Sequence, residues 1–456
     1  MYKKILIASL ALIAGLASCK KDDPTPNPNP PSGLTIDGVA STLEFYQLDT
    51  AHLSVAGVAK DAAAKAVWAV NGAKAAEGAT FDFTTAHPGK YEVTLTVDGK
   101  SAKHTYTVAP RFSEGAFLLN EGNFGNETGS LTYIHPSKML VIDQAYYRVN
   151  GTKLGNVCQD LAFENDKIYI LSQLGPKNGG EGLLTIARSN TLEKVKVYND
   201  EALAQSTPTH IAVLRDHIYI RTERDGILRG SSEGGFTPIA GTKKALKQRM
   251  AQVGERIFAL TKDNKILMIQ GAQVIRELST TPAQLTGIAV SHDGKLWVST
   301  TSPNEILKVD PDPNNFVVLQ RQALNQSISA TGPQSWERTT SSAFFAHGDK
   351  LYFTGQSSVI YCHDFATSKT SQVIDVKTID GVGTSANKYY NSLGVDPSTG
   401  ELYYAAFEDY GTYNKKNVTM VLKADGTKLL LKEKVNSFPA GFYFIPNAAS
   451  RTGANR

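Results

Sequence analysis

One stretch of the sequence decides the fold, and it reads Leu161-Ala162-Phe163-Glu164-Asn165-Asp166-Lys167-Ile168-Tyr169-Ile170. It consists of an apolar strand, a tight polar turn and a second strand with an aromatic residue, which is the pattern of a β-hairpin. The same pattern returns as Ile211-Ala212-Val213-Leu214-Arg215-Asp216-His217-Ile218-Tyr219-Ile220. A recurring hairpin indicates a repeat array rather than one domain around a single core.

Further copies of this hairpin follow toward the C-terminus. They occupy residues 251–260, 288–298, 343–353 and 393–404. The aromatic residue of the second strand recurs at intervals of 39 to 55 residues, at Tyr169, Tyr219, Phe258, Trp297, Tyr352 and Tyr403. All-β repeats of about 40–50 residues are typical of β-propeller blades. Each copy continues into two more strands, which predicts four strands in each blade.

One more blade has to be assembled from the two ends of the array. Ala116–Asn120, Ser130–Ile134 and Met139–Tyr146 supply three strands, and the apolar run 441–446 supplies a fourth that has no partner of its own. Pairing them closes the ring and removes the exposed sheet edges. The sequence therefore predicts an all-β protein with a seven-bladed propeller over residues 111–447, closed by the C-terminal strand, and a short tail at 448–456.

Residues 34–110 predict a separate, smaller β-sandwich. Alternating strands there are joined by the hairpin signals Asn71-Gly72 and Asp98-Gly99. Trp68 and the run Pro88-Gly89-Lys90-Tyr91 resemble the immunoglobulin-like PKD modules of bacterial surface proteins. No group of residues in this module indicates catalysis or ligand binding, so we interpret the module as a spacer.

The N-terminus has the pattern of a targeting segment. Residues 1–18 combine a basic start with an apolar run too short to span a bilayer, and small residues precede Cys19. This arrangement resembles the bacterial lipobox, in which Cys19 would be acylated and become the new N-terminus. Residues 19–33 would then be a proline-rich tether, since alternate prolines favour an extended chain. Lys20-Lys21-Asp22-Asp23 resembles the surface-export tag of Bacteroidetes lipoproteins. We therefore expect an outer-membrane lipoprotein exposed at the cell surface.

Composition excludes some functions but names none. The chain has 456 residues, a formal net charge of +4 and no strongly basic or acidic tract. A nucleic-acid partner would need a basic patch, so that class is not expected. Beyond Cys19, Cys158 and Cys362 are the only cysteines, and they lie too far apart in the repeat scheme to indicate a disulfide framework or a metal cluster.

The loops predict which face of the propeller carries function. The turn between the first two strands of each blade is tight, whereas the large insertions belong to the opposite face. Those insertions are rich in aromatic, amide and guanidinium side chains, which suit a bulky, partly flat polar ligand; packing of some rings against neighbouring loops is the alternative. The candidate ligand-binding residues are Asn120, Glu121, Asn123, Phe124, Gln173, Gln334, Trp336, Arg338, Tyr389, Tyr390, Asn391, Glu408, Asp409, Tyr410 and Tyr413.

No catalytic or metal-binding pattern emerges from the residues. Gly230-Ser231-Ser232-Glu233-Gly234 has the spacing of a nucleophile elbow, but it falls between outer strands and not at a strand-to-helix turn. The run 310–314 begins like a calcium loop and lacks its central glycine and closing glutamate. We expect no metal, no cofactor and no enzymatic activity.

The stretch from Gly115 to Pro446 resembles Bacteroidetes surface lipoproteins with YncE-like seven-bladed propellers, a family that includes the BtuG-type cobalamin-binding proteins. The resemblance rests on residues 117–125 with Gly129-Ser130-Leu131, on residues 159–162 leading to 167–170, and on residues 393–403. It implies capture of a corrinoid and its transfer to a TonB-dependent outer-membrane transporter. The preceding PKD-like module departs from the family pattern and puts a lid-like docking geometry in doubt.

Other functions remain open at this point. The ligand could be a siderophore, haem or a glycan instead of a corrinoid. The propeller could also be an enzyme of the lyase or lactonase type, which would need ionisable residues that converge at the channel mouth. Alternatively, it could be an adhesion scaffold that binds another protein through the same face.

Overall fold

The computed structural model describes residues 33–39, 44–328, 344–354, 357–389 and 393–446. The chain divides into two compact units. The first is made mainly of residues 51–83 and 90–106, and the second mainly of residues from 107 onward, with segments 44–50 and 84–89 grouped with it. Within the described ranges, no helix is both long and apolar enough to cross a membrane.

Two sheets lie mainly in the first unit. Their strand orders are β1-β3-β6 and β2-β8-β7-β4-β5, with one short helix, α1 (Lys60–Ala63). Trp68 is fully buried, and its indole Nε1 donates a hydrogen bond to the carbonyl of Gly78 at 2.9 Å. The strands are β1 (Thr35–Asp37), β2 (Phe45–Tyr46), β3 (Thr50–Ala56), β4 (Val67–Val70), β5 (Ala73–Glu77), β6 (Thr80–Thr84), β7 (Gly89–Val97) and β8 (Lys100–Ala109).

Both predicted hairpins of this unit are confirmed. Asn71-Gly72 joins β4 to β5 and Asp98-Gly99 joins β7 to β8, and all four residues have positive φ, as two-residue hairpin turns require. Among residues 44–49, only Phe45 and Tyr46 are paired in a strand.

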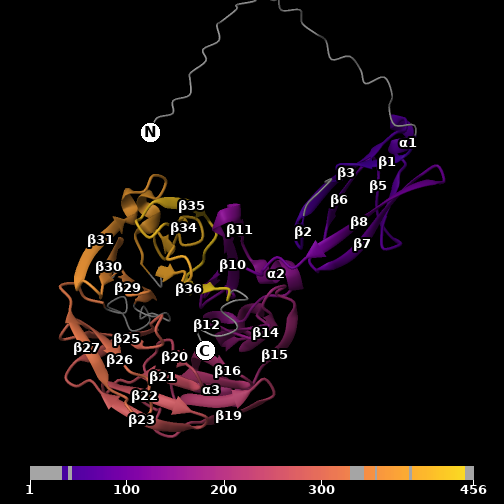
Figure 1. Ribbon diagram of the computed structural model, residues 1–456. Helices are drawn as coiled ribbons and strands as arrows, with labels where there is room; N and C mark the ends of the chain where they lie inside the picture. Colours follow the sequence, from indigo (N-terminus) through magenta and orange to yellow (C-terminus); the bar gives the residue numbers. More distant parts are fainter. Residues whose placement is uncertain (1–32, 40–43, 329–343, 355–356, 390–392, 447–456) are drawn as a thin grey trace, which may run out of the picture. The chain divides into compact units, whose positions relative to one another are not determined.

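The second unit contains seven four-stranded antiparallel sheets among the described residues. Figure 1 shows them following one another around a common centre, with low-numbered strands in magenta and high-numbered strands in yellow. From the innermost strand outward, the first three sheets are β36 (Pro439–Phe444), β9 (Ala116–Asn120), β10 (Ser130–His135), β11 (Leu140–Ile142); β12 (Asn156–Glu164), β13 (Lys167–Gly175), β14 (Leu184–Arg188), β15 (Lys194–Tyr198); and β16 (Pro208–Leu214), β17 (His217–Thr222), β18 (Gly226–Ser231), β19 (Gly234–Pro238).

The other four sheets repeat the same order. They are β20 (Ala251–Val253), β21 (Arg256–Leu260), β22 (Lys265–Gln270), β23 (Gln273–Ser279); β24 (Gln284–Val290), β25 (Leu296–Thr301), β26 (Glu305–Val309), β27 (Val318–Ala323); β28 (Phe345–His347), β29 (Lys350–Phe353), β30 (Val359–Asp364), β31 (Lys369–Asp375); and β32 (Leu393–Val395), β33 (Leu402–Phe407), β34 (Asn417–Leu422), β35 (Lys428–Glu433).

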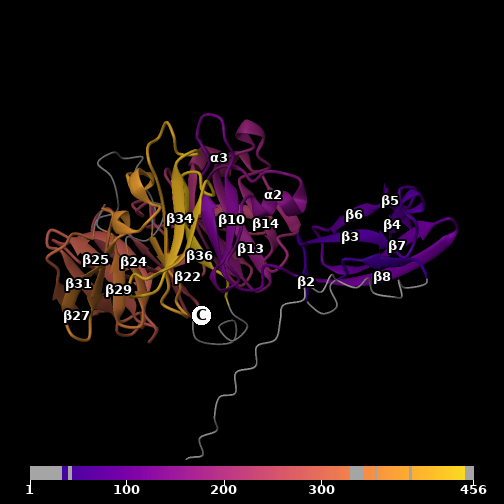
Figure 2. The same ribbon diagram turned by 90° about the horizontal axis from the view of Figure 1, so that it is seen from above.

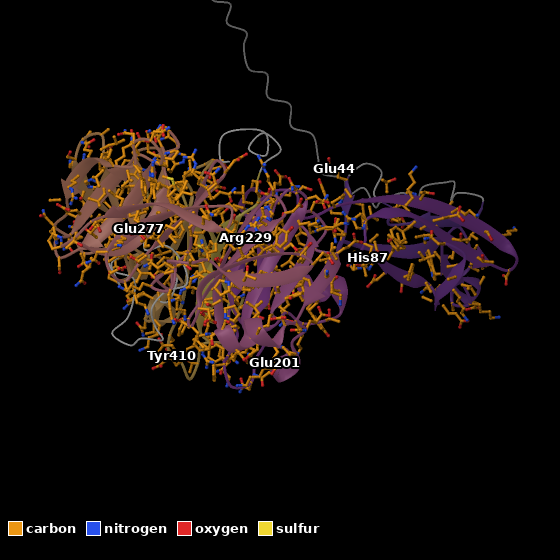
Figure 3. All side chains as sticks on the ribbon, turned by 90° about the horizontal axis from the view of Figure 1, so that it is seen from below. Glu44, His87, Glu201, Arg229, Glu277 and Tyr410 are labelled. Carbon is orange, nitrogen blue, oxygen red and sulfur yellow. The ribbon has the colours of Figure 1, made fainter. Side chains whose placement is uncertain are left out.

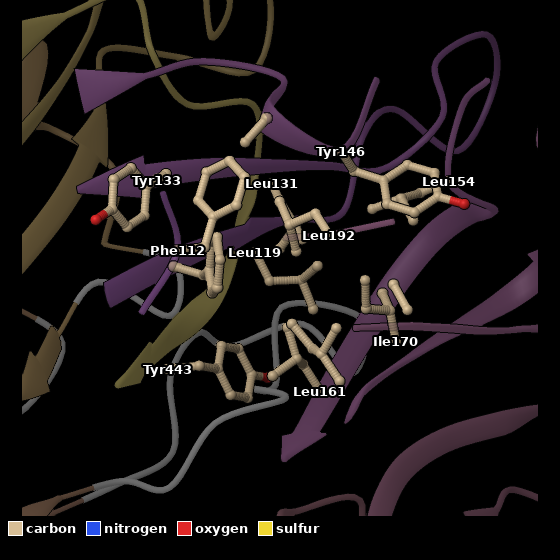
Figure 4. Close-up of a cluster of buried hydrophobic side chains, with 14 of the residues drawn as sticks. Phe112, Leu119, Leu131, Tyr133, Tyr146, Leu154, Leu161, Ile170, Leu192 and Tyr443 are labelled. Carbon is tan, nitrogen blue, oxygen red and sulfur yellow. The ribbon is translucent and has the colours of Figure 1, made fainter. Parts of the chain in front are cut away.

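Hydrophobic packing between consecutive sheets holds this array together. Each sheet contributes side chains to a buried cluster shared with the sheet before it and to another shared with the sheet after it. The strands are therefore apolar on both faces, which is expected where a sheet is covered on both sides. Figure 4 shows the cluster between the first and second sheets, where Tyr443 of β36 lies near Leu161 of β12.

The C-terminal strand fastens the array, as the sequence predicts. β36 pairs antiparallel with β9, with Phe442 opposite Leu118 and Tyr443 opposite Phe117. Phe442 and Leu118 also belong to a buried cluster with Tyr403 of the last sheet. Gly394 of β32 permits this approach, because a Cβ there would lie 2.5 Å from the Cβ of Phe442.

One predicted strand of the first sheet was wrong at its end. Residues 139–146 were expected to form one strand, but β11 stops at Ile142 and α2 (Ala145–Asn150) follows. Ala145, Tyr146 and Val149 are buried together, a helical spacing that places them on one face. Gly151 then ends the helix in the left-handed conformation.

The connections divide unequally between the two ends of the sheets. We call the "loop face" the end that carries the links from second to third strands and from sheet to sheet, and the "turn face" the opposite end. The loop face holds the long segments 121–129, 143–155, 176–183, 199–207, 239–250, 376–389 and 408–416, whereas the longest described turn-face link is 310–317. The one-sided distribution of long loops is therefore confirmed for the described residues.

The unequal division of the links between the two faces can be followed in Figures 2 and 3. Figure 2 shows the sheets of the second unit edge-on, with α2 and α3 (Glu201–Ser206) among the links of the loop face. Figure 3 places Tyr410, from link 408–416, and Glu201 at the same edge of the unit. Apart from η1 (Pro136–Lys138), the described helical segments of this unit lie in loop-face links: α2, η2 (Lys177–Gly179), α3, η3 (Val376–Thr378) and η4 (Gly383–Ala386).

We call the pairing of β36 with β9, together with its packing against the last sheet, the "seam". Removing the Phe442 side chain tests how much the seam contributes to stability. We expect Phe442→Ala to destabilise the second unit by about 3–5 kcal/mol, because it deletes a buried ring and leaves a cavity between the first and last sheets. The control is Leu319→Ala on the outer strand β27, where the side chain is 47% exposed and the expected cost is within about 0.5 kcal/mol. Urea unfolding followed by tryptophan fluorescence measures both, and equal midpoints for the two variants would contradict the seam's importance.

Candidate functional site

The loop face has a pocket of about 430 Å³ close to the seam. Its wall comes from the link after β9, the inner strand β12, its neighbour β13, the links before β20 and β36, and the link 408–416. The lining residues are Glu121, Gly122, Asn123, Phe124, Val157, Gln159, Gln173, Lys247, Tyr410 and Phe438. This volume lies within the range of small-molecule sites in proteins.

A buried carboxylate–amide pair lies at the inner side of the pocket. Gln159 is 2% exposed, and its Nε2 donates a hydrogen bond to Glu121 Oε1 at 3.0 Å. The other amide atom, Oε1 of Gln159, is buried and accepts no hydrogen bond from the described residues. A buried polar atom without a partner costs free energy, so this oxygen is an acceptor available to a ligand.

The backbone of β12 is distorted where it lines the pocket. Its pairing with β13 shifts register between Asn156 and Cys158 and again between Cys158 and Asp160. Val157, between these shifts, has a φ of 56°, which a β-branched residue rarely adopts. Bulges redirect side chains beside binding sites, and here both Val157 and Gln159 line the pocket.

The link 121–129 is held in place by hydrogen bonds from other elements. Asn156 Nδ2 donates to the carbonyls of Asn123, at 3.2 Å, and Glu127. Tyr413 Oη and Ser437 Oγ donate to Glu127 Oε2 at 2.9 and 2.8 Å. These contacts come from β12, from the link 408–416 and from the link before β36, so the pocket wall is fixed before a ligand arrives.

Gly122 is required by the shape of this link. Its φ is +75°, and a Cβ at this position would lie 2.2 Å from the carbonyl oxygen of Thr128. Any other residue would collide with the returning chain. This explains the glycine within the motif of residues 117–125.

Aromatic rings form another side of the pocket. Phe438 stacks against Tyr410 with ring centroids 5.9 Å apart, and it packs against Phe407 and Tyr413 as well. Phe124 is different, since it is 62% exposed and has only Lys177 Nζ over its ring, at 4.4 Å from the centroid. The supported rings give a rigid platform, and Phe124 offers an open aromatic face.

The site carries both signs of charge. Glu121 contributes a carboxylate that is 9% exposed, and Lys247 contributes a half-buried ammonium group. Behind Glu121, burial raises the pKa of the Cys158 thiol far above its usual range, and the nearby carboxylate of Glu121 adds to this shift. Cys158 is therefore an inert packing residue, as its isolation in the sequence suggests.

The pocket brings together some of the residues predicted from the sequence. Glu121, Asn123, Phe124, Gln173 and Tyr410 all line it. The other lining residues were not among the candidates predicted from the sequence; they are Gly122, Val157, Gln159, Lys247 and Phe438. Gln159 and Gly122 belong to motifs noted for the resemblance, whereas no sequence signal marks Lys247 or Phe438.

Other predicted residues lie outside the pocket. Asn120 is buried and bonds Ser130, Thr132 and the backbone of Ser437, so it joins the first sheet to the link before β36. Tyr413 is 8% exposed and supports the loop through Glu127. Both fit the alternative that some side chains hold the loops together.

The remaining described candidates stabilise their own loops. Glu408 accepts hydrogen bonds from Lys416 and Thr384, both at 2.8 Å, and these bonds lower the pKa of its carboxyl. Asp409 accepts from the backbone of Tyr410, and Tyr389 packs against the cluster between the last two sheets. The candidates Gln334, Trp336, Arg338, Tyr390 and Asn391, and the lipidation candidate Cys19, lie outside the described residues.

Comparisons with known proteins identify the fold and the family. A crystal structure described as a quinonprotein alcohol dehydrogenase-like protein from Bacteroides thetaiotaomicron is similar, with a TM-score of 0.58, 16% identity, and coverage of 90% of this chain and 99% of that one. BamB from Moraxella catarrhalis matches with a TM-score of 0.42, 10% identity, and coverage of 72% and 85%. No curated protein matches significantly. At this identity the first likeness shows the fold alone, and the second unit is a β-propeller.

The family follows from a separate match. Residues 114–446, which contain all seven four-stranded sheets, match the family described as "Domain of unknown function (DUF5074)". The match covers more than half of the chain, so this protein belongs to that family.

Proposed function

We propose that this protein is a cell-surface lipoprotein that captures a bulky polar nutrient at the loop-face pocket and passes it to a TonB-dependent outer-membrane transporter. In this proposal the seven sheets act as the seven blades of a closed propeller, and the first unit is an immunoglobulin-like spacer of the PKD type. The observation that carries the binding role is the pre-formed pocket, in which the buried Gln159 Oε1 has no partner among the described residues.

The lining favours a ligand with a ring and several hydrogen-bonding groups. Phe124, Tyr410 and Phe438 offer rings for stacking, while Gln159 and Gln173 offer amides. Glu121 and Lys247 bring opposite charges to the same pocket. A ligand that carries several polar groups and little net charge satisfies both, whereas a strongly charged ligand would meet repulsion from one of them.

A corrinoid is the first candidate ligand, on the strength of the family resemblance. The macrocycle with its substituents is larger than a pocket of about 430 Å³, so it would lie across the mouth with one polar substituent inserted. Phe124, 62% exposed at the rim, is the residue on which the flat face would rest. Transfer to a TonB-dependent transporter would then need the ligand's outer face to stay accessible.

Calorimetry with cyanocobalamin tests the ligand. We expect heat of binding with the purified protein, and a loss of affinity of about three- to tenfold in Phe124→Ala, because one stacking ring is removed. Tyr147→Ala is the matched control, since that ring is 46% exposed but lies outside the pocket. Absence of heat would exclude the corrinoid, after which haem, ferric siderophores and oligosaccharides are measured in the same way. An equal loss in both variants would exclude this pocket as the site.

Metabolic labelling tests the anchor. We expect radioactive palmitate to be incorporated into the protein in a native host, and Cys19→Ser to lose both the label and the membrane association, since acylation needs the thiol. Cys362→Ser, in which a half-buried thiol of β30 is replaced, is the control and should keep both. Membrane association that persists in Cys19→Ser would contradict the lipoprotein proposal.

A further inference from the structure

A second hollow of about 410 Å³ lies in the centre of the propeller near the turn face. The inner strands supply its wall. Phe163 is the penultimate residue of β12, Val290 ends β24 and Val395 ends β32. Phe442 and Phe444 lie in the last three residues of β36. Inner strands run from the loop face to the turn face, so these residues mark the turn-face end of the central space.

This hollow is distinct from the loop-face pocket. Three segments extend from the loop-face pocket to the hollow. β12 contributes Gln159 to the loop-face pocket and Phe163 to the hollow. The link into β20 contributes Lys247 to the loop-face pocket and Met250 to the hollow. Likewise, Phe438 precedes the part of β36 that lines the hollow. The two cavities therefore occupy opposite ends of one central space.

A buried ion pair lies between the two ends. Arg249 Nε is 3.3 Å from Asp160 Oδ1, and Tyr443 Oη donates a hydrogen bond to the same oxygen at 2.7 Å. The backbone N–H of Ile211 donates to Asp160 Oδ2 at 2.9 Å, and the guanidinium lies over the Tyr443 ring at 3.9 Å. Arg249 and Tyr443 line the hollow, so the pair forms its inner end.

The inner end of the hollow offers hydrogen-bond donors without a net charge. The positive charge of Arg249 is balanced by the carboxylate of Asp160. The guanidinium nevertheless has donor capacity to spare: Nη2 is buried and has no hydrogen-bond partner among the described residues, and Nη1 lies 3.4 Å from the carbonyl oxygen of Phe442. An uncharged acceptor placed there would satisfy a donor that is otherwise buried alone.

The rest of the wall is apolar and only partly covered. Phe163, Phe345 and Phe444 are half-buried, and among the described lining residues Gln252 alone carries a side-chain amide. Half-covered phenylalanine rings around a cavity of this size would gain from contact with an apolar molecule, at about 25 cal/mol for each Å² removed from water. The described residues that line the hollow include no carboxylate, so they offer a cation no partner.

We propose that the turn-face hollow is a second binding site, and that it takes a small, neutral, apolar molecule with one hydrogen-bond acceptor directed at Arg249. The acceptor, a ketone, ester or ether oxygen, accepts a hydrogen bond from the guanidinium of Arg249. The ring or alkyl part lies against Phe163, Phe345 and Phe444. This site does not depend on what the loop-face pocket binds.

Fluorescence of the neutral ketone prodan with the full chain tests the site. We expect a blue shift and saturable binding, and a loss of affinity of at least about tenfold in Gln252→Trp, because the indole fills the hollow. Gln173→Trp makes the same substitution in the loop-face pocket and should leave prodan binding unchanged. No saturable binding, or an equal loss in both variants, would overturn the proposal. Circular dichroism checks that both variants keep the strand content.

Competition on the unmodified protein tests the chemistry without relying on any variant. We expect 2-acetylnaphthalene to displace prodan at about a tenfold lower concentration than 2-ethylnaphthalene, which has the same shape and no acceptor. Equal displacement would overturn the role of Arg249. Stronger displacement by 2-naphthoate would overturn the neutral class and show that the site takes an anion.

Discussion

The pairing of β36 with β9 is the interaction on which the rest of this structure depends. These strands come from opposite ends of the propeller sequence, and their pairing completes the first sheet and brings it against the last. Without it, the inner edge of β9 would be an unpaired row of backbone groups. The seam is secured on both sides by apolar packing, with Phe442 and Leu118 toward the last sheet and Tyr443 toward the second.

The candidate site is built on this seam. Glu121 directly follows β9 and Phe438 directly precedes β36, and the backbone N–H of Glu121 donates to the carbonyl of Phe438 at 2.8 Å. Asn120 continues the connection by accepting from the backbone of Ser437 at 3.0 Å. Closure of the ring and assembly of the pocket are therefore one structural event, which accounts for the burial of two polar residues, Asn120 and Glu121, where β9 ends.

The central space joins two different environments. Toward the loop face it is lined by amides, opposite charges and supported rings; toward the turn face it is lined by phenylalanines and aliphatic side chains. Asp160, Arg249 and Tyr443 lie between them. Burial raises the pKa of Asp160, while Arg249 and the donors around its oxygens act in the opposite direction. The pair is costly to bury and is retained where the two environments meet.

The hairpin repeat alone was enough to predict strands, four-stranded sheets and the closing strand, because alternation and tight turns are local properties of the chain. It also predicted which face carries the long loops. It could not distinguish Phe124, which is open to a ligand, from Tyr413, which supports a loop, since both are aromatic residues in loop-face links. Lys247, Gln159 and Phe438 meet only because three segments distant in sequence converge on one axis. Local pattern determines which strands form, whereas side-chain convergence depends on packing between sheets, and only the tertiary structure decided it.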